Sequence, residues 1–110
     1  MTDNAPLRRN RKPTHPGQIL REHYLVPRKV TQAEFAKDIE ISEKHLSRII
    51  NGHVRLDSDV AAKISKALNT TTEFWVNLQA KIDAWEGNAK AASWQPRIVY
   101  SAPEYVQTPA

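Results

Sequence analysis

The 110-residue chain contains no cysteine and only three glycines. Without cysteine it has no disulfide framework, no Cys-ligated zinc site and no thiol nucleophile. Gly17, Gly52 and Gly87 stand singly, so no glycine-rich phosphate-binding loop can be drawn. No apolar run approaches the roughly 20 residues of a membrane span. No apolar segment follows the first arginines, as a secretory signal would require. We therefore expect a cytoplasmic protein with a single domain.

Motifs for catalysis or metal binding are also missing. The four histidines show no i,i+4 pairing and no HExxH motif; they are His15, His23, His45 and His53. No Ser-His-Asp or paired-carboxylate arrangement can be singled out. We therefore expect neither an enzyme nor a bound metal or other cofactor.

Basic residues, by contrast, concentrate in the first half of the chain. Residues 1–56 hold eleven Lys and Arg against six Asp and Glu, whereas residues 57–110 hold five against six. A basic half on a small domain suggests a polyanionic partner, most commonly nucleic acid. A solvated surface with an uneven distribution of charge is the alternative.

Residues 1–14 are polar, lack hydrophobic periodicity and are predicted to be a disordered arm. The arm either lies along DNA phosphates or is simply solvated. Its basic residues are Arg8, Arg9, Arg11 and Lys12.

Cap and stop residues divide residues 15–86 into five predicted helices. The first opens at His15-Pro16 and is stopped by Pro27, because proline suits the first helical position but not the interior. A Thr-Gln-Ala-Glu capping box opens the second. The fifth ends at Gly87. The second to fifth helices begin at Thr31, at Ser42, at Asp57 or Ser58, and at Thr70 or Thr71.

The helices Thr31–Ile39 and Ser42–Asn51, joined by a tight turn, have the form of a helix-turn-helix. Ala36 is small enough for a steep crossing. The second helix buries Leu46, Ile49 and Ile50 and leaves a polar face that can enter the major groove. On that face the residues expected to read bases are Glu43, Lys44, Ser47 and Arg48. The residues expected to contact phosphates are Thr31, Gln32, Asn51 and Arg55. Taken singly, Glu43 and Arg48 fit a solvated pair equally well, and Asn51 fits a helix cap.

The fifth helix is apolar over more than one stripe, as if it were covered on two sides. It contacts either a second subunit or a thicker core within the chain. The residues assigned to a dimer interface there are Trp75, Leu78, Ile82 and Trp85. Beyond it lies a tail, residues 87–110, in which Arg97–Tyr100 is β-prone. This run, with Ile98 and Tyr100, either pairs with the same strand of another copy or is unstructured.

Several of these blocks together resemble the phage-repressor-like (Xre-type) helix-turn-helix and, more closely, the HigA/VapI antitoxin family. The match covers roughly residues 15–86. The blocks that carry it are His15-Pro16-Gly17-Gln18-Ile19-Leu20, Thr31-Gln32, Leu46-Ser47-Arg48-Ile49-Ile50-Asn51-Gly52 and Thr72-Glu73-Phe74-Trp75-Val76-Asn77-Leu78-Gln79.

This resemblance implies an all-α, five-helix DNA-binding domain that dimerises and represses its own operon at an inverted-repeat operator. It also implies a toxin partner, HigB, an mRNA endonuclease. Two alternatives stay open: a free-standing regulator without a toxin, and a toxin-sequestering module that has lost DNA binding. One residue departs from the family pattern. The family usually has glycine in the turn where this chain has Glu40, so the turn is either strained or differently shaped.

Overall fold

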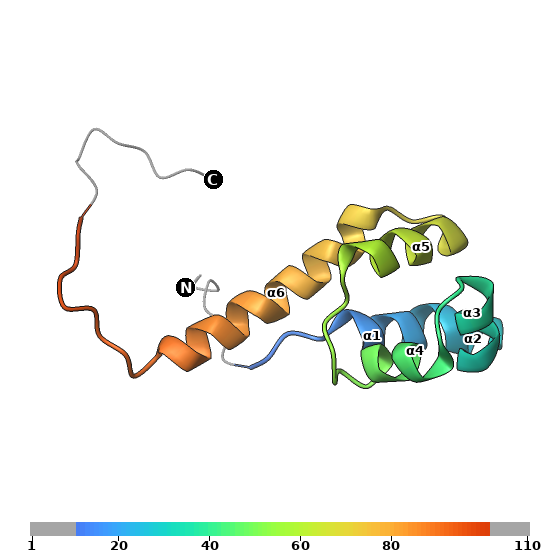
Figure 1. Ribbon diagram of the computed structural model, residues 1–110, viewed down its shortest axis with the longest axis horizontal. Helices are drawn as coiled ribbons and strands as arrows, with labels where there is room; N and C mark the ends of the chain where they lie inside the picture. Colours follow the sequence, from blue (N-terminus) through green and yellow to red (C-terminus); the bar gives the residue numbers. More distant parts are fainter. Residues whose placement is uncertain (1–10, 102–110) are drawn as a thin grey trace, which may run out of the picture.

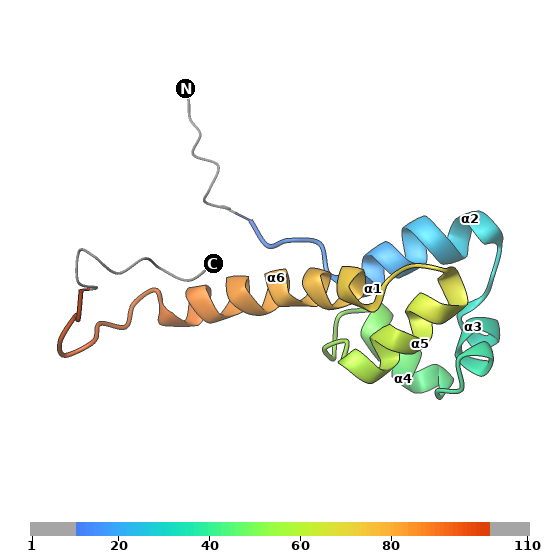
Figure 2. The ribbon, with the colours of Figure 1, turned by 90° about the horizontal axis from the view of Figure 1, so that it is seen from above.

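The computed structural model describes residues 11–101, which fold into a small helical domain with one long projecting helix. Figures 1 and 2 show the helices α1 to α5 gathered at one end of the molecule, with α6 extending away from them. The principal extents are 53 × 31 × 25 Å. In the described part of the chain no helix is long and apolar enough to cross a membrane.

The first helix is continuous from Pro16 to Arg28 and changes its winding on the way. Its parts are α1 (Pro16–Ile19), the π-helical segment η2 (Leu20–Leu25) and α2 (Val26–Arg28). The prediction that Pro27 stops this helix is wrong. The Val26 N–H bonds to the Arg21 carbonyl, five residues back. This wider turn leaves Pro27 in the first turn of α2, where its missing N–H costs little.

The next two helices begin where the sequence predicts, at α3 (Gln32–Asp38) and α4 (Glu43–Ile50). Thr31 and Glu34 form the complete capping box: each side chain accepts a hydrogen bond from the other's backbone N–H, at 3.0 and 2.9 Å. Ser42 Oγ accepts from the His45 N–H at 3.0 Å. Glu40, in the turn between them, has φ +61°. The backbone therefore keeps the left-handed turn without the glycine that normally accommodates it.

The helix α5 (Ser58–Leu68) starts after Asp57, and α6 (Thr72–Ala91) starts after Thr71. Both caps lie within the predicted alternatives. Gly87, however, does not end the last helix, which continues to Ala91. A lone exposed glycine inside a helix costs only about 1 kcal/mol, so it need not stop the helix.

The core joins residues from η2, α3, α4, α5 and α6. Trp75 has no exposed surface, and its ring packs 5.3 Å from that of Tyr24 and 5.0 Å from that of Phe74. Its indole N–H donates to Thr70 Oγ1 at 2.7 Å. The other apolar residues with at most 1 % exposure are Leu20, Ala36, Leu46, Ala61 and Ile64. The first turns of α6 thus close the domain.

The described part of the tail, residues 92–101, is irregular, and of the two alternatives for residues 97–100 the single chain shows the one without a strand. Ile98 is 47 % exposed and Tyr100 85 % exposed. A strand needs a neighbour for its N–H and C=O groups, and within a single chain the described residues supply no second strand.

Candidate nucleic-acid interface

The helix α4 has two chemically distinct faces. Its inner face is buried, with Leu46, Ile49 and Ile50 between 0 and 3 % exposed. On the outer face Glu43, Lys44 and Arg48 are exposed, while Ser47 is half-buried. Three members of the predicted base-reading set are therefore accessible on a short helix.

The residues predicted to hold phosphates fall into two groups. Thr31 and Gln32 lie at the N-terminus of α3, where unpaired backbone N–H groups favour an anion. The Thr31 hydroxyl and backbone N–H are already used by the capping box. Asn51 is the C-cap of α4, and its Nδ2 donates to Ser47 Oγ at 3.3 Å. In the free protein, Thr31 and Asn51, for which the sequence predicts phosphate contacts, thus already make hydrogen bonds within the chain at the helix ends.

Arg55 is engaged with α6 in the free protein. Its Nε donates to Asp83 Oδ1 at 3.2 Å, and its terminal nitrogen pairs with the other carboxylate oxygen. These hydrogen bonds lower the pKa of Asp83 and raise that of Arg55. A phosphate contact by Arg55 would have to compete with Asp83 for the same guanidinium.

The basic arm enters the domain on the side of α6. Lys12 Nζ lies 2.8 Å from Glu86 Oε2 and 5.9 Å from the centre of the Trp85 ring. Arg11 is exposed, and Arg8 and Arg9 lie outside the described residues. Figure 2 shows the segment before α1 running toward the side of α6, while His15 itself lies against Gly52, just after α4. The described root of the arm therefore does not extend the base-reading face.

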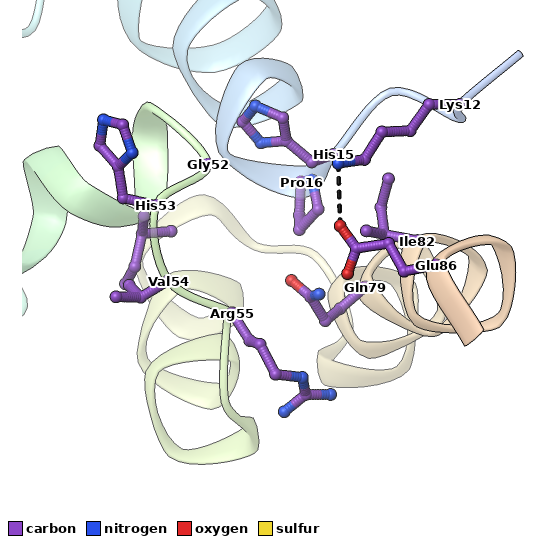
Figure 3. Close-up of a pocket in the computed structure, with 11 residues that line it drawn as sticks. Lys12, His15, Pro16, Gly52, His53, Val54, Arg55, Gln79, Ile82 and Glu86 are labelled. Atoms are coloured by element: carbon purple, nitrogen blue, oxygen red, sulfur yellow. Dashed lines mark ion pairs between the residues drawn. The ribbon is translucent and has the colours of Figure 1, made fainter. Parts of the chain in front are cut away.

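A shallow cavity of about 210 Å³ lies between three parts of the chain: the root of the arm, the loop after α4, and α6. Figure 3 shows Lys12, His15, His53 and Arg55 around it, with Glu86 paired to Lys12. Both cations are matched by acids, Lys12 by Glu86 and Arg55 by Asp83. The cavity thus lacks the surplus positive charge expected of a phosphate site, and the described residues contain no cluster of acids and histidines that could hold a metal.

The residues assigned to a dimer interface divide in the structure. Trp75 is fully buried and Ile82 is 4 % exposed, both within the chain's own core. They cannot present a surface to a second subunit, so their assignment to the interface is corrected. Leu78 and Trp85 are half-buried, and Ile98 and Tyr100 are exposed. A thicker intrachain core explains the first half of α6, and the apolar surface left open lies farther along the chain.

Two residues to which the sequence analysis gave no role contact α4 and the loop that follows it. At Gly17 of α1, an added Cβ would lie 2.1 Å from the Ile49 carbonyl oxygen. Gln79 of α6 is 6 % exposed and accepts the Leu56 N–H at 2.9 Å. The available signals were a glycine inside a predicted helix and a glutamine within an otherwise apolar run. Neither signal identifies the partner, because Ile49 is distant in sequence from Gly17, and Leu56 is distant from Gln79.

Two packed helices, a short turn and an exposed polar second helix define a helix-turn-helix DNA-binding domain. A helix-turn-helix family model matches residues 20–75, half of the chain. The chain belongs to this phage-repressor-like (Xre-type) family. Its homologues include HigA antitoxins and virulence-associated protein I. It is a family of DNA-binding regulators, not of enzymes.

Three similar proteins place the chain within the family. An uncharacterised HTH-type transcriptional regulator of Haemophilus influenzae is 38 % identical, over 69 % of this chain and 71 % of its own length. Antitoxin HigA-1 of Vibrio cholerae is 36 % identical over the same shares of the two chains. The solved structure of antitoxin GraA in complex with its operator is 28 % identical, with a TM-score of 0.66, covering 84 % of this chain and 98 % of that one.

Proposed function

We propose that the protein is a dimeric repressor that reads an inverted-repeat operator with α4 and serves as the antitoxin of a HigB-like mRNA endonuclease. The observation that carries the proposal is the outer face of α4, where Glu43, Lys44 and Arg48 are exposed beside Ser47. Arg48 and Lys44 suit guanine O6 and N7, and Glu43 suits the cytosine amino group. The similarity to GraA, solved with its operator, supports the same use of the fold.

Dimerisation is proposed from the surface that the core leaves open. Trp94 is 66 % exposed and Val99 76 %, and the end of α6 projects beyond the domain. Half-buried Trp85 and exposed Ile98 and Tyr100 lie along the same stretch of chain. A two-fold pair would set two copies of α4 about one helical turn of DNA apart, ~34 Å. Sedimentation analysis of the full chain measures the oligomeric state directly.

Titration of the protein against its own upstream promoter and an unrelated duplex, at two salt concentrations, tests the DNA proposal. We expect a preference for the promoter of about 10³ or more, measured by fluorescence anisotropy. Equal and salt-sensitive binding to both duplexes would refute sequence-specific repression. The protein would then be better described as an interaction module that has lost operator recognition.

The toxin partner is tested separately. We expect co-expression to relieve growth arrest by a HigB-like toxin encoded beside the gene, and the two chains to co-purify. Specific promoter binding without such a neighbour or such a complex would favour a free-standing regulator. The similarity to HigA-1 of Vibrio cholerae supports the antitoxin role.

A further inference from the structure

Gln79 is an unusually placed polar residue in the middle of α6. Among the described residues only Ser65 and Gln79 are buried polar side chains. Both ends of the Gln79 amide are used. Oε1 accepts the Leu56 N–H at 2.9 Å, and Nε2 donates to Asp83 Oδ1 at 3.0 Å. A buried glutamine that satisfies both its donor and its acceptor holds its two partners in a fixed relation.

The partner of Gln79 is the anchor of the loop that follows α4. This loop begins where the His53 N–H bonds to the Arg48 carbonyl at 2.8 Å. It ends at Leu56, whose side chain is 3 % exposed in the core. The loop is thus tied to the last turn of α4 at one end and to α6, through Gln79, at the other.

Asp83 extends the same connection to the surface. Its Oδ1 accepts from both Gln79 Nε2 and Arg55 Nε. Asp83 therefore fixes the direction of the Gln79 amide and the position of Arg55 with one carboxylate. Two residues of α6 together hold a backbone N–H and a side chain of the loop.

We propose that Gln79 is a positioning residue for DNA recognition: through Leu56 it fixes the end of α4 and so sets operator affinity without touching DNA. This inference rests on the proposed function of α4. On the other side, Gly17 backs the Ile49 backbone. Loss of Gln79 releases one of two supports while every side chain of the base-reading face remains.

The main test substitutes Gln79→Leu in the full chain, which removes both hydrogen bonds without changing the charge. At a temperature well below unfolding, we expect its affinity for the promoter to fall about tenfold, because the Leu56 N–H is left buried and unpaired. The dependence of affinity on salt should stay that of the wild type, since no phosphate contact is lost. Wild-type affinity in a folded Gln79→Leu variant would overturn the proposal.

The direction in which Asp83→Ala changes promoter affinity separates a positioning role from an electrostatic effect. Asp83→Ala removes a negative charge, which by itself should tighten binding to DNA. We expect it instead to weaken promoter binding several-fold, because Gln79 and Arg55 lose their common acceptor. Glu73→Ala is the matched control, since Glu73 is exposed on the first turn of the same helix. Tighter binding by Asp83→Ala, whether from the lost charge or from an Arg55 freed for phosphate, would contradict the proposal whatever the control does.

A reciprocal exchange keeps the proposal falsifiable if Gln79→Leu does not fold. Gln79→Glu places two carboxylates together and should weaken promoter binding. In the Gln79→Glu/Asp83→Asn double variant, the asparagine amide can donate to the new carboxylate, which still accepts the Leu56 N–H. The double variant has the net charge of the wild type, and we expect it to recover the affinity for the promoter that Gln79→Glu loses. A double variant that binds no better than Gln79→Glu would overturn the assignment.

Amide hydrogen exchange in the free protein supplies a measure that does not depend on DNA. Loss of Gln79 should speed exchange of residues 52–56 while Ile64, fully buried in α5, keeps its protection. Faster exchange at both places to the same extent would show a general loss of stability and refute positioning. If the wild type does not prefer its promoter, the proposed function fails, and the exchange result alone decides whether Gln79 holds the loop.

Discussion

Gly17 of α1 packs directly against the backbone of Ile49 in α4, so that a Cβ on Gly17 would lie 2.1 Å from the Ile49 carbonyl oxygen. The Ile50 Cα would be 2.6 Å away. These are backbone atoms and cannot turn aside as a flexible side chain can. The glycine of the His-Pro-Gly opening is therefore needed for space against the last turn of α4.

Gly17→Ala should lower the free energy of unfolding by about 2–3 kcal/mol, toward the upper end of overpacking effects. Gly87→Ala is the matched control. Gly87 lies inside α6 with nothing within 4 Å of an added Cβ, so alanine should stabilise the protein by about 0.5–1 kcal/mol. Urea denaturation of both variants measures the difference. Equal effects of the two substitutions would show that the contact with Ile49 is not tight.

Glu40→Gly should stabilise the protein. Glu40 has φ +61°, a conformation that costs an L-residue roughly 1–2 kcal/mol and that glycine adopts without this cost. Glycine is also more flexible in the unfolded chain, which offsets part of this gain in stability. The net gain should be about 0.5–1 kcal/mol. Glu40→Ala, which removes the same carboxylate but keeps a Cβ, should not show it. A gain of equal size from alanine would assign the effect to charge rather than to the backbone.

His15 should make stability depend on pH. Its Nδ1 accepts the Gln18 N–H at 3.3 Å as the N-cap of α1, which only an unprotonated nitrogen can do. Burial, and then the charge of Lys12, lower the pKa of His15. The folded state thus favours the neutral ring. The stabilisation is complete above the unfolded pKa, about 6.5, and is lost as pH falls through the lower folded value.

The measurement is thermal or urea unfolding between about pH 7 and pH 5, where histidines titrate. His15→Asn keeps a good N-cap acceptor and cannot titrate, so its stability should vary less over this range. Glu34 and Asp83, whose pKa values are lowered by hydrogen bonds, should act only at lower pH, near where carboxyl groups titrate. A wild-type loss that His15→Asn reproduces in full would exclude His15 as its source.

Local sequence signals predicted much of this fold because caps are local. Thr31, Ser42 and Thr71 each bond to an N–H three residues ahead, so their helix starts can be deduced from adjacent residues. Pro27 was misjudged because the π-helical turn before it depends on how the whole helix packs. The many apolar residues of α6 predict that the helix is covered, but they do not tell whether the chain's own core or a second subunit covers it.

The candidate site was predicted in the same uneven way. The exposed set on α4 follows from helical periodicity, since the buried residues of that helix fix its outer face. Arg55 was assigned to phosphate because it is basic and follows α4. Its partner Asp83 is 28 residues away, so only the tertiary structure brings the two together. The hydrogen bond between Gln79 and Leu56, which are 23 residues apart, could not be predicted for the same reason.

Arg48→Ala offers the most direct test of the base-reading face. Arg48 is exposed on α4, so its removal should leave the free energy of unfolding nearly unchanged while weakening promoter binding by about 1–3 kcal/mol. Binding to an unrelated duplex should fall less, because a base contact carries sequence discrimination. Lys81→Ala removes the same charge from an exposed position on α6 and controls for net charge. If Arg48→Ala and Lys81→Ala reduce binding equally on both duplexes, Arg48 acts only through its charge and the face of α4 does not read bases through it.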